Sequence, residues 1–298
     1  LGEKGPEKGS GRPSKMLGFN PLSACGVGID IHPDHALAVV TDLDGRVLYR
    51  TETAMDPSPE SMAALARKCV EKAGMTQEKT IGLGVSLPGT GWQNYSLAEE
   101  LGRLLPFPVE INNEANCAAL GERWKGTGAR ADDLCYIAIG QGVGSAIICD
   151  GELIYGAACR AGEIGYLLGE IDQEMSNRNV LGEPGVLERK IWSTLSSCGL
   201  NLEQMFQAYV QGKEPARGAV TYFIRDLARV IANIASMLNP EVVVIGGIVA
   251  QYMKPVLPDI RAVVGGLTPI PTRVELGSLG PWAAAMGAAF QGSVHSKL

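Results

Sequence analysis

The sequence of 298 residues lacks several features, and each absence narrows the class of protein. Its seven cysteines form no C-x-x-C pair and are odd in number, which argues against a disulfide scaffold and predicts a reduced, cytoplasmic chain. The longest apolar runs, such as Val242 to Ile245, are far too short to span a membrane. We expect no signal peptide, because the N-terminal stretch is polar and rich in glycine.

An excess of positive charge is also missing. The formal net charge is −6 with 19% charged residues, so the surface as a whole does not suit nucleic acid. Hydrophobic residues make up 46% of the chain, which excludes a disordered protein and allows a sizeable core. At this length we expect two packed lobes rather than one domain.

Glycine, in contrast, is abundant. The sequence has 38 glycines in 298 residues, roughly 13%, against a usual content of about 7%. They show no Gly-X-Y period, which excludes a collagen-like fibre. We therefore expect the excess to lie in turns and in loops that bring the backbone close to a nucleotide-like or sugar-like ligand.

Residues 1–21 are rich in Gly, Pro, Ser and Lys and carry four basic against two acidic residues. This composition is typical of a solvated linker. A second interpretation is that the segment is the end of a DNA-binding head.

The remaining chain contains one pattern twice. The same order of elements occurs near 27–49 and again near 134–155. It consists of a strand, a glycine turn or loop, a second strand, an Asp-Gly turn and a third strand. Helical spacing of apolar residues occurs at 59–74 and 215–238, and shorter helices are expected at 96–105, from 113 and at 281–291. The repetition predicts two like lobes with a cleft between them.

Several segments, in this order, resemble the ROK family, which unites sugar kinases and sugar-responsive transcriptional repressors: GVGIDI, GVSLPG, INNEANCAALGE, IAIGQGVGSAIICDGELIYGAACRAGEIGY and NPEVVVIGG. The resemblance covers about residues 10–292. It implies an α/β protein with a two-lobed actin/hexokinase-like fold, which is a duplicated ribonuclease H-like fold. We expect an N-terminal lobe of residues 22–120 plus 284–298 and a larger C-terminal lobe of residues 121–283.

The phosphate-binding residues of the kinases are only partly present. The family's kinases carry D-x-G-G-T in the first hairpin, whereas Asp30 is followed here by Ile31, His32, Pro33 and Asp34. Pro33 has no N–H to donate and Asp34 would repel phosphate, which argues against tight ATP use. We expect His32 and His35 to be solvated surface residues rather than metal ligands. The remaining positions of this degenerate phosphate set are Gly140, Gly142, Gly144, Gly246 and Gly247.

The sugar-contacting residues are better preserved. The resemblance places sugar contacts at Pro88, Gly89, Asn113, Glu114, Glu163 and Glu188. Glu114 stands in Asn-Glu-Ala-Asn, where kinases have an aspartate that acts as the base; some repressors of the family also have glutamate there. Tyr166 replaces the histidine of G-E-x-G-H, and its phenol can still donate a hydrogen bond.

No metal site is expected. Many ROK proteins follow G-E-x-G-H with a cysteine cluster that binds zinc, but residues 163–188 contain neither cysteine nor histidine. We therefore expect no zinc and no other cofactor, with ATP and Mg²⁺ only if the chain is a kinase.

These residues predict the sugar-sensing and dimerising domain of a bacterial transcriptional regulator that lacks kinase activity. The expected partners are a monosaccharide or sugar phosphate, a second copy of the chain or a higher homo-oligomer, and DNA, which would be bound through a winged-helix head preceding residues 9–20. The alternative is a divergent ATP-dependent kinase for a hexose or amino sugar, with Glu114 as its base. A third possibility is a scaffold that binds only other proteins.

Overall fold

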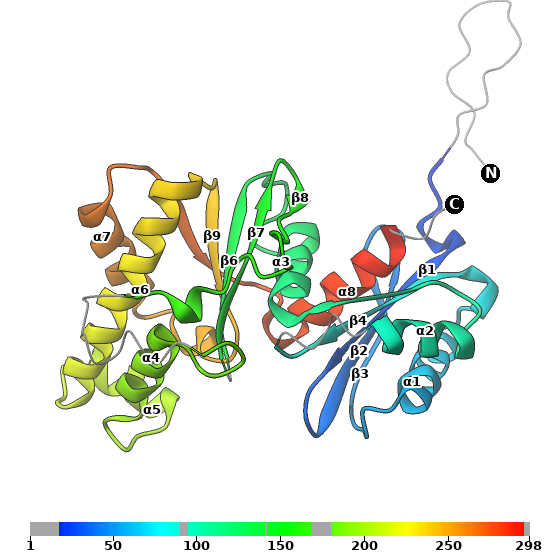
Figure 1. Cartoon of the computed structure of the whole chain (residues 1–298), viewed down its shortest axis with the longest axis horizontal. Helices are drawn as coiled ribbons and strands as arrows, with labels where there is room; N and C mark the ends of the chain where they lie inside the picture. The colour runs from blue at the N-terminus through cyan, green and yellow to red at the C-terminus, as the bar shows by residue number, and fades with distance from the viewer. Residues whose placement is uncertain (1–17, 90–94, 141, 169–179, 295–298) are drawn as a thin grey trace, which may run out of the picture.

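The computed structural model describes residues 18–89, 95–140, 142–168 and 180–294, which form two lobes side by side (Figure 1). Each lobe is built on one five-stranded sheet. Most of the segment 1–21, expected to be a linker, lies outside the described residues. Its end, Pro21–Ser23, forms a short 3-10 helix.

The first sheet has the strand order β3-β2-β1-β4-β5. Strands β1 to β3 form an antiparallel meander, and β4 and β5 are added parallel to β1. The predicted Asp-Gly turn joins the second and third strands, with Gly45 at a φ of 77° that favours glycine. The strands are β1 (Cys25–Ile31), β2 (His35–Asp42), β3 (Val47–Ala54), β4 (Thr80–Leu87) and β5 (Val109–Asn113).

The second sheet has the order β10-β9-β6-β7-β8 and repeats the same plan. An antiparallel meander is again extended by two parallel strands, which confirms the repetition seen in the sequence. The third strand of this meander is shorter than the predicted segment, although the N–H of Ile154, directly after it, still donates to the carbonyl oxygen of Ile147. The strands are β6 (Leu134–Ile139), β7 (Val143–Cys149), β8 (Glu152–Leu153), β9 (Val242–Gly246) and β10 (Arg273–Leu276).

The helices cover these sheets. Five of them match predicted segments: α1 (Pro59–Lys72), α2 (Tyr95–Leu104), α3 (Glu114–Lys125), α6 (Ala216–Leu238) and α8 (Ala283–Val294). Three further helices were not among the predicted segments: α4 (Val186–Ser196), α5 (Leu202–Val210) and α7 (Leu257–Leu267).

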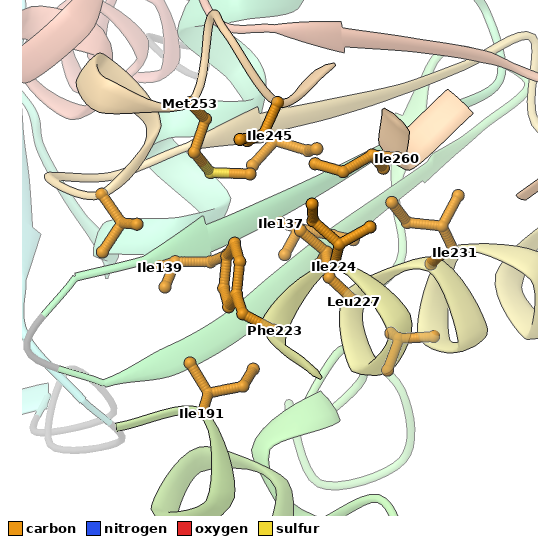
Figure 2. Packing of buried hydrophobic residues seen from close by; sticks show 14 of the residues in the cluster. Ile137, Ile139, Ile191, Phe223, Ile224, Leu227, Ile231, Ile245, Met253 and Ile260 are labelled. Atoms are coloured by element: carbon orange, nitrogen blue, oxygen red, sulfur yellow. The ribbon is translucent and has the colours of Figure 1, made fainter. Parts of the chain in front are cut away.

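The core of the second lobe forms where α6 packs on the sheet. Figure 2 shows Phe223 and Leu227 of α6 facing Ile137 and Ile139 of β6. Ile191 of α4 closes one side of this cluster. Fully burying a side chain of this kind stabilises the fold by about 1.5–3 kcal/mol, so α6 is a main contributor to the stability of the lobe.

Many glycines lie where α8 packs, which corrects the expectation that the excess belongs to turns and ligand loops. A β-carbon on Gly28 or Gly84 of the first sheet would lie 1.9 Å from a carbonyl oxygen of α8. A β-carbon on Gly287 of α8 would lie 1.6 Å from the carbonyl oxygen of Cys117 in α3. Backbone therefore packs on backbone between α8, the first sheet and α3, which joins the two lobes.

All seven cysteines lie among the described residues and are free thiols, four of them buried. Among the described residues, no helix combines the length and the apolar character that crossing a membrane requires.

We predict that Gly287→Ala destabilises the protein by about 3 kcal/mol, at the upper end of what overpacking usually costs, because backbone blocks the new methyl group. The measurement is the free energy of unfolding from denaturant titration. Gly102→Ala is the matched control, since Gly102 lies in α2 with open space around it and alanine favours a helix by about 1 kcal/mol. Equal stability of Gly287→Ala and wild type would contradict this packing.

Candidate functional site

A cavity of about 390 Å³ lies between the two lobes. The structure brings all seven predicted sugar residues to it, together with three of the predicted phosphate glycines: Pro88, Gly89, Asn113, Glu114, Glu163, Tyr166, Glu188, Gly140, Gly142 and Gly144. The first four come from the ends of β4 and β5 and the start of α3, and the others belong to the second lobe. Gln141, between two of these glycines, lies outside the described residues.

Glu114 is placed by the start of α3. The Asn113 side chain caps this helix by accepting a hydrogen bond of 2.7 Å from the N–H of Asn116. Glu114 is the first residue of the helix and lines the cavity. Burial raises the pKa of its carboxyl, the negative charge of Asp30 raises it further, and His32 opposes this shift. Keeping this carboxylate charged therefore costs free energy unless a hydrogen-bond donor contacts it.

Glu163 is positioned by the close approach of Gly162 to β7. Gly162 has a φ of 88°, and its carbonyl oxygen accepts hydrogen bonds from both the N–H and the hydroxyl of Ser145. Burial raises the pKa of Glu163; Arg160 opposes the shift and Glu188 adds to it.

Glu188 lies in the first turn of α4, beside the glycine loops. A β-carbon on Gly165 would lie 3.2 Å from its Oε2, and one on Gly142 would lie 3.4 Å from its Oε1. Side chains at these two positions would crowd the Glu188 carboxylate, so the glycines leave the carboxylate room at the cavity.

Tyr166 ends the short 3-10 helix Ile164–Tyr166 and lines the cavity. Its Oη accepts a hydrogen bond of 3.0 Å from the N–H of Gly182. The zinc that many relatives of this family would hold here does not fit, since residues 163–188 supply neither thiolate nor imidazole and the phenol is engaged with backbone. No group of three or more metal-ligating side chains occurs within the part of the chain that the structure describes.

Asp30 does not line the cavity, and its carboxylate already has two partners. Ser86 Oγ donates to Asp30 Oδ1 at 2.5 Å, and His32 Nε2 lies 3.0 Å from Asp30 Oδ2. The expectation of a solvated His32 is wrong, since its ring is half-buried, bonded to Asp30 and stacked on His35 at 4.4 Å. The hydrogen bond with Asp30 raises the pKa of His32 despite burial, with further help from nearby carboxylates.

The β1–β2 hairpin has few free donors for a phosphate. The N–H of His32 donates to the His35 carbonyl oxygen at 2.9 Å, and Pro33 has no N–H. Asp34 pairs with His35 at 2.7 Å. Gly246 and Gly247, at the end of β9, also lie outside the cavity lining; a β-carbon on Gly246 would lie 1.9 Å from the hydroxyl of Tyr136. Gly247 nevertheless lies against Ile139, directly before Gly140, so the glycines of these two loops are neighbours. The part of the predicted phosphate set that does not suit a phosphate is therefore the β1–β2 hairpin.

Glu183 also lines the cavity and was not predicted, because no pattern marks it in a segment without regular structure. Asn112, directly before Asn113, was missed as well. Its Nδ2 donates to Gln291 Oε1 of α8 at 2.9 Å and to Tyr155 Oη of the second lobe at 3.2 Å. Asn112 is buried, so this network ties the cavity edge to α8 and to the other lobe.

The fold and the cavity together define a two-lobed α/β protein with a candidate ligand site between its lobes. The profile of the ROK family matches residues 26–291, and the chain belongs to this family.

Both branches of the family are similar to the chain. The xylose repressor of Caldicellulosiruptor bescii is 28% identical over 300 residues, which cover 87% of this chain and 74% of the repressor. The glucokinase of Halalkalibacterium halodurans is 30% identical over 215 residues, 61% of this chain and 65% of the kinase. The crystal structure of a ROK family transcriptional regulator, a homologue of the E. coli MLC protein, superposes with a TM-score of 0.75 and 21% identity, covering 93% of this chain and 80% of that chain.

We predict that the His32–Asp30 pair makes stability depend on pH near neutrality. The pKa of His32 is raised above its ordinary value of 6.5, so the stabilisation is fully present below about pH 6.5 and is lost as pH rises through the higher folded-state pKa. Unfolding free energies measured from pH 5.5 to 8.5 should therefore fall with rising pH more steeply in wild type than in His32→Gln. Asp30→Asn should flatten the profile in the same way. A His32→Gln profile parallel to that of wild type would contradict the pairing.

Proposed function

We propose that this chain is the sugar-sensing effector and dimerisation domain of a ROK-type transcriptional regulator and that it has no kinase activity. The observation that carries the proposal is the contrast between an assembled acidic cavity and a β1–β2 hairpin that offers few donors to a phosphate. The similarity to xylose repressors supports the regulatory branch.

The cavity suits the hydroxyl groups of a sugar. Glu114, Glu163, Glu183 and Glu188 present carboxylate groups to one small space, and carboxylates are strong acceptors for hydroxyl donors. Burial raises the pKa of Glu114 and of Glu163, so a ligand that donates hydrogen bonds would compensate the lost solvation. Asn113 and the backbone beside Pro88 and Gly89 add polar groups at the opposite wall.

The charge of the cavity favours a neutral monosaccharide over a sugar phosphate. Among the described residues that line it, four are glutamates and none is lysine, arginine or histidine. A phosphate placed among these carboxylates would be repelled, with little screening in a partly buried site. Of the two ligand classes that the sequence leaves open, we therefore propose the neutral one, with no metal or other cofactor.

Sugar binding would act by shifting a population of lobe arrangements. A ligand that contacts both lobes can favour only the arrangement in which both sets of contacts form. Asn112 connects the cavity edge to Gln291 of α8, and the end of α8 lies beside Gly26 at the start of β1. We propose that this path carries the change to DNA-binding heads across a cytoplasmic dimer.

The second candidate is a divergent sugar kinase. It is favoured by the similarity to the glucokinase and by Glu114, a partly buried carboxylate in the cavity at the position of the kinase base. Against it, the side chain of Asp30 is engaged by Ser86 and His32. A scaffold that binds only proteins is disfavoured, because it would have no use for four glutamates around one cavity.

We predict that a neutral pentose or hexose stabilises the wild-type chain and that the corresponding sugar phosphate does not. At a concentration of 100 times the Kd, the gain is about 2.7 kcal/mol, which a thermal-shift screen detects as a higher Tm. Glu114→Ala and Glu163→Ala should each lose most of this shift, because each removes an acceptor from the cavity.

Glu71→Ala is the matched control, since Glu71 is exposed on α1 and lies away from the cavity. It should keep the full sugar-dependent shift. The absence of any shift across a monosaccharide panel, or an equal shift in all three variants, would overturn the proposed site.

A further inference from the structure

Tyr166 and Gly182, which are 16 positions apart in the sequence, are joined by a hydrogen bond at the cavity. Gly182, Glu183 and Pro184 form one wall of the cavity. Bringing positions this far apart together costs conformational entropy, so the wall needs contacts that hold it beside Tyr166.

Zinc cannot make that contact here, as the residues around the wall contain no thiolate and no imidazole. We propose that Tyr166 is a positioning residue that closes this wall without a metal, by accepting the N–H of Gly182 on its hydroxyl oxygen.

Two further contacts hold the same wall. The backbone of Gly185 lies directly on that of Gly165 and Tyr166: a β-carbon on Gly185 would be 2.1 Å from the carbonyl oxygen of Gly165. Arg189, one turn into α4, donates from Nη1 to the carbonyl oxygen of Pro184. The wall is thus fixed from α4 on one side and from Tyr166 on the other.

The consequence concerns the ligand. Glu183 lies directly after the hydrogen-bonded N–H of Gly182, so the position of its carboxylate in the cavity depends on this bond. The role follows from the tyrosine at position 166. It rests on the proposed function only in its effect on sugar affinity; the hydrogen bond itself can be tested without any ligand.

The test is Tyr166→Phe, which removes the hydroxyl and keeps the ring. Amide hydrogen exchange followed by mass spectrometry should be about tenfold faster at Gly182 in Tyr166→Phe than in wild type, with little change elsewhere, as expected when a hydrogen bond worth about 1.4 kcal/mol is lost. The affinity for the neutral monosaccharide that stabilises wild type should fall by about threefold to tenfold. Tyr222→Phe, on the exposed face of α6, should change neither quantity.

The second part of the experiment uses a metal chelator. Sugar binding by wild type should be the same with and without EDTA, and added zinc should not restore binding to Tyr166→Phe. Unchanged exchange at Gly182 in Tyr166→Phe, or loss of wild-type binding in EDTA, would overturn the role of Tyr166. If no monosaccharide binds wild type, the proposed function fails, and the exchange measurement alone still decides whether Tyr166 closes the wall.

Discussion

Contact between backbones at the crossing of α8 with α3 is the constraint on which the two-lobed arrangement depends. Gly287 of α8 lies directly against the carbonyl of Cys117 in α3, and Gly28 and Gly84 let the same helix lie against the first sheet. Because α3 begins at Glu114, this crossing also fixes where the Glu114 carboxylate lies in the cavity between the lobes. The glycines of the chain thus allow close packing between the two lobes and also line the cavity.

The second feature that bears on function is the distribution of charge between the two lobes. Acidic groups gather at the cavity, while the imidazole of His32 lies behind them, against Asp30. In a phosphoryl-transfer site the reverse is needed, with donors and cations directed at the phosphate. The described lining of the cavity, with four glutamates and no lysine, arginine or histidine, differs from such a site.

Much of this could be predicted from the sequence, because strand alternation, Asp-Gly turns and the long stripe of α6 are local signals. The seven residues that the family motifs predict to contact sugar all line one cavity. What could not be predicted depends on contacts between distant segments: the pairing of His32 with Asp30, the bond from Gly182 to Tyr166, and the bridge from Asn112 to Gln291. Glycine spacing likewise does not reveal which glycines meet a helix rather than a ligand.

The central claim is that the cavity binds a sugar that the protein does not phosphorylate. The most direct measurement incubates the chain with Mg-ATP and the sugar that stabilises it, and then quantifies sugar phosphate by mass spectrometry. The account predicts bound sugar and no sugar phosphate above the level of a protein-free control. Accumulation of sugar phosphate that is abolished by Glu114→Gln would contradict it and would identify the chain as a kinase.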